Sequence, residues 1–212
     1  MKRLGLATIA FVVLFADPSS AKLEIDFAHA HKTPGLQQQP VPDREVAHFT
    51  RIISRHPQDD DAYFRRGIAN LYSGAPSRAL ADVTHAAELD PSYPYYALWA
   101  DILSKRNHRQ SGLAQAISRI DMAKWPAPIV RLFLGEGGSA AVLAAARDPD
   151  VETQASRLCE ANFYIGEVAL EHGAHEVAAR RFRLAATNCP HGVDFVEGPA
   201  AEAELRALGP SP

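Results

Sequence analysis

Residues 60–91 read DDAYFRRGIANLYSGAPSRALADVTHAAELDP, and residues 159–190 read CEANFYIGEVALEHGAHEVAARRFRLAATNCP. Both stretches follow the spacing G-x6-G-x4-A-x3-(V/F)-x2-A-x4-P without a gap. The matching positions are Gly67, Gly74, Ala79, Val83, Ala86 and Pro91 in the first stretch, and Gly166, Gly173, Ala178, Phe182, Ala185 and Pro190 in the second. The last three positions recur upstream as Phe49, Ile52 and Pro57, and Pro57 lies 34 residues before Pro91. A fixed period of this length indicates a repeat architecture.

Each stretch predicts two helices joined by a short turn. In the first stretch we expect one helix over residues 62–72, ended by Gly74, and a second over residues 77–89, stopped before Pro91. Gly67 falls in the middle of the first helix, where glycine costs ~1 kcal/mol relative to alanine. We therefore expect the paired helix to cross closely at Gly67. Residues 59–61 are three aspartates at a helix start, a pattern more typical of helix capping than of a metal site.

The rest of the chain predicts further helices, so the fold class is all-α. Residues 43–54 resemble the second helix of an incomplete repeat, with Asp43 as its cap. Residues 92–151 are helical but less regular and have room for two degenerate units. Expected helices there cover residues 95–105, 113–120 and 140–146, with another after Trp125-Pro126-Ala127-Pro128. Residues 199–208 predict an amphipathic helix that covers the last apolar face, and residues 209–212 are a tail.

The N-terminal segment predicts export. Residues 1–3 are basic at two positions, residues 4–16 are apolar and too short to span a membrane comfortably, and Ala21 follows two serines. We expect a signal peptide over residues 1–21 with cleavage after Ala21, and a polar, flexible arm over residues 22–42. The expected location is the periplasm or the exterior. No cysteine follows the apolar run, so lipid attachment there is not expected, and a net charge of −3 without a basic stripe argues against nucleic acid as partner.

The repeated motifs resemble those of tetratricopeptide repeat (TPR) proteins. The resemblance rests on Tyr63-Phe64-Arg65-Arg66-Gly67, Ala79-Leu80 and Ala86-Ala87-Glu88-Leu89-Asp90-Pro91. The runs at 124–128, 132–135 and 159–167 are further similar to exported bacterial repeat proteins, the NlpI-like envelope lipoproteins. The resemblance implies a solenoid of helical hairpins over residues 43–208. It also implies a non-enzymatic scaffold or adaptor, without a cofactor, that binds another envelope protein.

In such a solenoid the first helix of each pair lines a concave groove. By the family pattern the groove is lined by Phe64, Ile68, Leu71, Tyr72, Leu98, Ile102, Lys105, Arg106, Phe163, Glu167, Leu170 and Glu171. Relatives that clamp a peptide carboxylate carry Lys and Asn at such places. Here Phe64 and Ile68 stand instead, which argues against that clamp.

Cys159 and Cys189 bracket the last repeat. In an antiparallel helix pair, the start of the first helix lies beside the end of the second. Both thiols therefore fall at one end of the hairpin, and an exported chain meets an oxidising compartment. We expect a Cys159–Cys189 disulfide; two reduced thiols that fill core space are the alternative.

Two other functional classes stay open. One is an enzyme with a carboxylate or histidine site, and the other is a structural protein whose groove packs on itself. The close histidine pairs are not expected to bind zinc, because Gly173 breaks the helical register between His172 and His175, and because His29 and His31 lie in the expected arm. No nucleophile, phosphate-loop or dinucleotide motif is present. A dense cluster of facing Asp, Glu and His would favour the enzyme, whereas an apolar groove without perturbed titrating groups would favour the scaffold.

Overall fold

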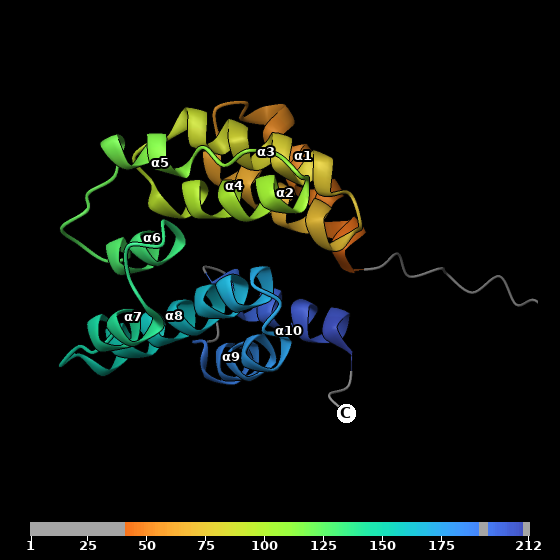
Figure 1. Ribbon diagram of the computed structural model, residues 1–212. Coiled ribbons are helices and arrows are strands. Elements are labelled where there is room, and N and C mark those ends of the chain that lie inside the picture. Colours follow the sequence, from red (N-terminus) through yellow and green to blue (C-terminus); the bar gives the residue numbers. More distant parts are fainter. Residues whose placement is uncertain (1–40, 191–194, 210–212) are drawn as a thin grey trace, which may run out of the picture. The chain divides into compact units, whose positions relative to one another are not determined.

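A computed structural model describes residues 41–190 and 195–209 of the chain, and these residues form an all-helical fold (Figure 1). They comprise ten α-helices and one 3-10 helix, and they contain no strand. None of these helices is both long and apolar enough to cross a membrane. The expected signal peptide, nearly all of the expected arm, and most of the expected tail lie outside the described residues.

The helices follow one another along the chain with short connections. They are α1 (Val41–Arg55), α2 (Asp60–Tyr72), α3 (Pro76–Leu89), α4 (Pro94–Arg106), α5 (Leu113–Ala116), the 3-10 helix η2 (Ile117–Arg119), α6 (Ala127–Phe133), α7 (Ser139–Ala145), α8 (Val151–Glu171), α9 (His175–Asn188) and α10 (Glu197–Leu208). Sequential neighbours pack on each other in the pairs α1–α2, α2–α3, α3–α4, α6–α7, α8–α9 and α9–α10.

Several boundaries differ from those expected. Helix α1 begins at Val41, so Asp43 lies in the first turn, where its charge suits the helix dipole, and is not the cap. Helix α8 begins well ahead of Cys159 because the Asp150 side chain accepts a hydrogen bond from the Thr153 amide at 2.7 Å. The expected helix over residues 113–120 is only α5 followed by η2. Ile120 leaves it in an extended conformation (φ −99°, ψ 139°) and buries its side chain.

The two clear repeats are helix pairs that touch at their glycines. A Cβ atom added to Gly67 would lie 2.7 Å from Val83 Cγ2, and one added to Gly166 would lie 2.6 Å from the Phe182 ring. Val83 and Phe182 occupy the same position of the sequence pattern. The four pattern alanines, Ala79, Ala86, Ala178 and Ala185, are fully buried. The mid-helix glycines are therefore explained by close helix packing, as expected for Gly67.

The same turn closes both pairs. Gly74 and Gly173 have φ values of +78° and +71°, which glycine adopts without steric cost. The Ala75 amide donates to the Asn70 carbonyl at 2.9 Å, and the Ala174 amide donates to the Ala169 carbonyl at 2.8 Å. These bonds satisfy carbonyls that a helix end leaves without partners. The two pairs thus share backbone geometry as well as sequence.

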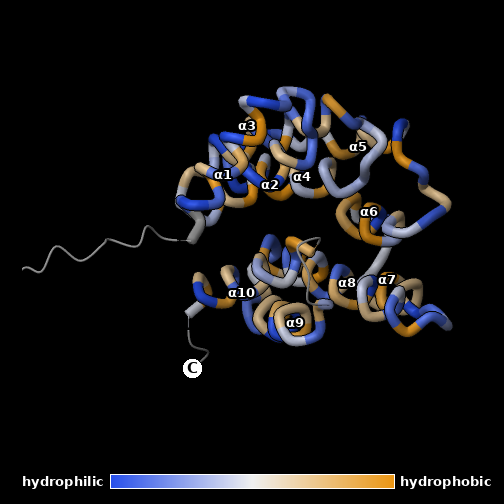
Figure 2. The backbone as a smooth tube through the Cα atoms, turned by 180° about the vertical axis from the view of Figure 1, so that it is seen from behind, coloured by the Kyte–Doolittle hydropathy of each residue, from blue (hydrophilic) through white to orange (hydrophobic). Residues whose placement is uncertain are grey.

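The core connects the early helices to the late ones. The Trp99 ring of α4 stacks on Phe163 of α8 with centroids 5.2 Å apart, and Phe64 of α2 meets Trp99 edge-on at 6.2 Å. Aromatic pairs of this kind add stability beyond their buried area. Helix α10 packs on α9 and α8, so it covers the last pair as expected. Figure 2 shows hydrophobic and hydrophilic residues alternating along most helices, with α6 among the most hydrophobic stretches.

Cys159 and Cys189 form a disulfide that joins α8 to the residue after α9. Their Cα atoms lie 4.7 Å apart, and Cys159 is fully buried. The expectation of a bond at one end of the last hairpin is confirmed. The bond closes the hairpin at the end opposite the Gly173 turn.

Candidate functional site

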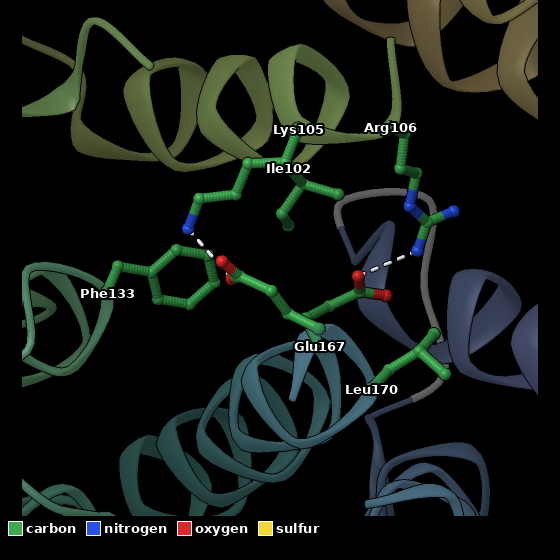
Figure 3. A pocket seen from close by; sticks show the side chains of 7 residues that line it. Ile102, Lys105, Arg106, Phe133, Glu167 and Leu170 are labelled. Carbon is green, nitrogen blue, oxygen red and sulfur yellow. Dashed lines mark hydrogen bonds and ion pairs between the residues drawn. The ribbon is translucent and has the colours of Figure 1, made fainter. Parts of the chain in front are cut away.

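A pocket of about 310 Å³ opens where α4, α6 and α8 meet. It is lined by Ile102, Lys105, Arg106, Phe133, Glu167, Leu170 and Glu171. Figure 3 shows the two basic side chains reaching from α4 toward α8, with Phe133 entering from α6. The volume lies at the small end of the range for ligand sites in proteins, and the mixture of an apolar wall with a few charged groups is typical of them.

Arg106 connects three helices at one side of the pocket. Its Nη2 atom donates to Glu167 Oε2 of α8 at 2.7 Å, and its Nη1 atom donates to Glu204 Oε1 of α10 at 2.8 Å. Tyr72 of α2 also donates its hydroxyl to Glu204 Oε1, at 3.2 Å. The two carboxylates raise the pKa of Arg106 against the opposing effect of burial. Arg106 therefore stays charged and is shared by two acids.

Lys105 is shared in the same way on the other side of the pocket. Its Nζ atom lies 2.8 Å from Glu171 Oε2 and 3.0 Å from Asp101 Oδ2. It also lies 5.7 Å from the centre of the Phe133 ring, within reach of a cation–π interaction. Asp101 is almost fully buried, whereas the Glu171 side chain is 40% exposed. Lys105 thus holds one internal acid and one acid at the mouth of the pocket.

Glu167 is a strongly perturbed acid of the pocket. It is only 6% exposed, and its Oε1 atom is buried without a hydrogen-bond partner. Burial is the main cause that raises the pKa of Glu167 to about 7; the nearby Glu204 and Glu171 add to the rise, and Arg106 opposes it. The protonated form of Glu167 is therefore favoured more than that of an exposed glutamate.

The structure separates the expected groove residues into two groups. Ile102, Lys105, Arg106, Glu167, Leu170 and Glu171 line the pocket together. Leu98 and Phe163 are fully buried and Phe64 is 5% exposed, so these three pack in the core and do not face a groove. Ile68 is also buried, and Leu71 and Tyr72 are half-buried against the core. The apolar residues of the first helices are buried because α2, α4 and α8 pack on one another through them.

Three residues that complete the site were not expected from the sequence. Phe133 supplies the wall from α6, Glu204 supplies the second acid for Arg106, and Asp101 supplies the second acid for Lys105. Glu204 could have been found from the sequence. It shares a helix face with Ala200 and Ala201, and an acidic residue on a buried face needs a partner.

A second buried acidic cluster lies at the other end of the contact between α4 and α8. Glu160 Oε2 accepts hydrogen bonds from the Tyr95 hydroxyl at 2.5 Å and from Trp125 Nε1 at 2.6 Å. Glu197, at the start of α10, accepts from the Tyr164 hydroxyl at 3.0 Å. Burial, with a smaller contribution from Glu160, raises the pKa of Glu197 to about 7. These hydrogen bonds join α4, α8, α10 and Trp125 in one internal contact.

Histidines contribute little to either cluster. His85 contacts the exposed Glu88, and His172 contacts the Val168 carbonyl at the end of α8. Within residues 41–190 and 195–209, no three His, Cys, Asp and Glu side chains are grouped so that they could hold a metal ion. His29 and His31 lie outside the described residues. No protein-family model matches the chain.

Proposed function

We propose that this chain is an exported scaffold of the TPR type that holds a segment of another protein in the pocket between α4, α6 and α8. The observation that carries the proposal is the pocket itself. It lies on the first helices of successive pairs and combines an apolar wall with charges at its mouth.

The shared geometry of the two clear repeats supports the TPR architecture. Both pairs place a glycine against the same pattern position of the partner helix, and both close with the same glycine turn. The rings of Phe64, Trp99 and Phe163 place α2, α4 and α8 in successive contact. In a solenoid of helical pairs, each repeat contacts its neighbours in this manner. Residues 107–150, with their short helices α5, α6 and α7, correspond to the degenerate middle.

The chemistry of the pocket favours binding over catalysis. A perturbed acid would favour an enzyme, and an apolar groove would favour a scaffold. The pocket has both features, because apolar side chains lie beside Glu167, whose pKa is raised. However, the ion pair with Arg106 favours the ionised form of Glu167 and opposes the rise of its pKa, which makes Glu167 a weaker general base. We therefore keep an enzyme as the second candidate, carried by the raised pKa of Glu167 alone.

Export is supported by two features. The N-terminal residues have the composition of a cleaved signal peptide, and Cys159 and Cys189 form a disulfide. Disulfides persist in oxidising compartments and are rare in reducing ones. We place the protein in the periplasm or outside the cell, where its partner is another envelope protein. Self-association through the pocket is a further arrangement that the same binding chemistry allows.

A random-peptide display selection on the purified chain tests the binding role. We expect peptides that bind the wild-type chain and bind the Phe133→Ala, Leu170→Ala variant at least about tenfold more weakly, because both apolar walls are lost. The matched control is Val177→Ala, Leu184→Ala, which removes two exposed apolar side chains of α9 and should leave binding unchanged. Circular dichroism checks that all variants are folded. Enrichment of no peptide, or equal binding by both variants, contradicts the proposal.

A further inference from the structure

Around the pocket, two cations are paired with four acids, and two of these acids, Glu167 and Glu171, line the pocket itself. Arg106 is shared by Glu167 and Glu204, and Lys105 is shared by Asp101 and Glu171. Two cations therefore face four carboxylates. Acids held at such distances repel one another unless a further positive charge or a proton is added. The charge balance of the pocket thus favours a cationic ligand.

Glu167 gives an independent sign of an incomplete site. Its Oε1 atom is buried and has no hydrogen-bond partner, although an ionised carboxylate accepts several hydrogen bonds. Glu167 lines the pocket, so a hydrogen-bond donor bound in the pocket would lie beside the Glu167 carboxylate. An unpartnered buried acceptor in a native protein calls for an explanation, and a missing donor is the simplest one.

The walls of the pocket define the shape of that donor. Ile102, Phe133 and Leu170 are the apolar residues that line the pocket (Figure 3). Glu171 lines it as well, and its side chain is 40% exposed. A lysine or arginine side chain has an apolar stem and a charged end, and it buries the stem along apolar side chains. A cavity of about 310 Å³ has room for one side chain of this size and not for a folded element.

We propose that the pocket binds a lysine or arginine side chain presented by an extended segment of the partner protein. The ligand's charged group lies between Glu167 and Glu171, and its stem lies on Phe133 and Leu170. The inference rests on the proposed function, because it names the chemistry of the segment that the scaffold holds. An acidic segment would add to the excess of acids around the pocket, and a neutral segment would leave that excess uncorrected.

NMR titration of the isotope-labelled chain with synthetic peptides tests the inference. The probes are acetylated and amidated pentapeptides, Gly-Leu-X-Leu-Gly, in which X is Lys, Arg, Gln, Glu or Met. We expect signals of pocket residues to shift with the Lys and Arg probes, with an affinity about tenfold or more above that for the Gln and Glu probes. Glu171→Gln should lower the affinity for the Lys probe about tenfold, whereas Glu152→Gln, an exposed acid at the start of α8, should not change it.

The pH dependence gives a second readout. The groups that face Glu167 are Arg106 of α4, Glu171 of α8, Glu204 of α10 and Tyr72 of α2, and Phe133 of α6 lines the same pocket. A bound cation requires the ionised form of Glu167, so affinity for the Lys probe should rise from about pH 6 to about pH 8. Glu167→Gln should abolish this rise. A rise that persists in Glu167→Gln contradicts the assignment of the ligand to this acid.

Other outcomes separate this inference from the proposed function. If the display selection yields peptides that depend on the pocket but are not enriched in Lys or Arg, the charge assignment is wrong and the scaffold role stands. If n-butylamine binds as tightly as the Lys pentapeptide, the ligand is a small amine and the polypeptide assignment is wrong. If no peptide of any kind binds, the scaffold role itself fails.

Discussion

At the scale of single residues, Gly67 and Gly166 have the clearest structural requirement. Each lies in a helix at the point where its partner helix leaves no room for a Cβ atom. The neighbour at Gly166 is the ring of Phe182, and Phe182 is fully buried. A rigid ring in a packed core has little freedom to move away. The sequence pattern pointed to this requirement because the cost of glycine inside a helix needs a compensating contact.

We predict that Gly67→Ala and Gly166→Ala each destabilise the protein by about 1–2 kcal/mol. The clash with the paired helix exceeds the ~1 kcal/mol that alanine gains in helix propensity. Urea unfolding followed by circular dichroism measures the change. Gly137→Ala is the control, because its new Cβ would lie 3.7 Å from the nearest atom, an ordinary contact. Unchanged stability of both helix variants would mean that the helices are farther apart than described.

Glu197 makes stability depend on pH. Burial raises its pKa to about 7 in the folded state, above the 4.5 of an unperturbed glutamate. The folded state therefore binds more protons than the unfolded state between these values, and stability falls as pH rises through this window. We predict that Glu197→Gln, which keeps an acceptor for Tyr164, gains on the order of 1–3 kcal/mol at about pH 8 and little at about pH 4. Urea unfolding at several pH values tests this, and parallel pH profiles for the two proteins would contradict it.

At the scale of elements, the α8–α9 pair is held at both ends. The Gly173 turn closes one end, and the Cys159–Cys189 disulfide closes the other. The pair also receives α10 on its outer side. This pair is therefore the best constrained part of the described chain. Residues 113–145 contrast with it, because they contain only the short helices α5, α6 and α7 and the 3-10 helix η2.

We predict that Cys159→Ala, Cys189→Ala lowers the free energy of unfolding by about 3–4 kcal/mol. The bond spans 30 residues, and in the chain-entropy model it removes freedom mainly from the unfolded chain. Chemical denaturation of the variant and of the wild type with and without reductant measures the loss. Mass analysis without reductant should find no free thiol in the wild type. Free thiols there, or an equal midpoint for the variant, would contradict the prediction.

At the scale of the whole described fold, Arg106 connects elements that are far apart in the sequence. It binds Glu167 of α8 and Glu204 of α10, and it shares Glu204 with Tyr72 of α2. Both glutamate side chains are about 5% exposed. Removal of the arginine would leave two buried acids without their cation, which costs far more than the loss of a surface ion pair.

We predict that Arg106→Gln lowers stability by about 3–5 kcal/mol at about pH 8, where Glu167 is ionised, and by less at about pH 6. Thermal unfolding at the two pH values measures the effect. Arg180→Gln is the matched control, because its only described ion pair, with Glu176, is long and highly exposed, and we expect no measurable change. A loss below about 1 kcal/mol at both pH values would mean that water reaches these acids.

The candidate site could be predicted only in part. The sequence placed Ile102, Arg106 and Glu167 on a common surface, because the first helices of repeated pairs share a face. It also placed Phe64, Leu98 and Phe163 there, and the structure buries all three. Periodicity shows that such residues share one side of a helix, but it does not show whether another helix covers that side. The contacts of α4 with α8 decide this, and they join residues more than 60 positions apart, as in the bond between Lys105 and Glu171.

The sequence by itself determined the helical class, the two helix pairs with a glycine at each crossing, and their turns, and it favoured a disulfide at one end of the last pair. These features follow from spacings within about 32 residues, over which local backbone preferences and close helix packing act together. Tertiary structure alone decided which side chains stay accessible at the surface. It brought Phe133 to the pocket, and it brought Asp101 and Glu204 to the two basic residues that line the pocket. The excess of acids over cations arises from helices that meet only in the folded state. The physical reason is that burial and charge balance depend on every neighbour in space, and a linear pattern records only the neighbours along the chain.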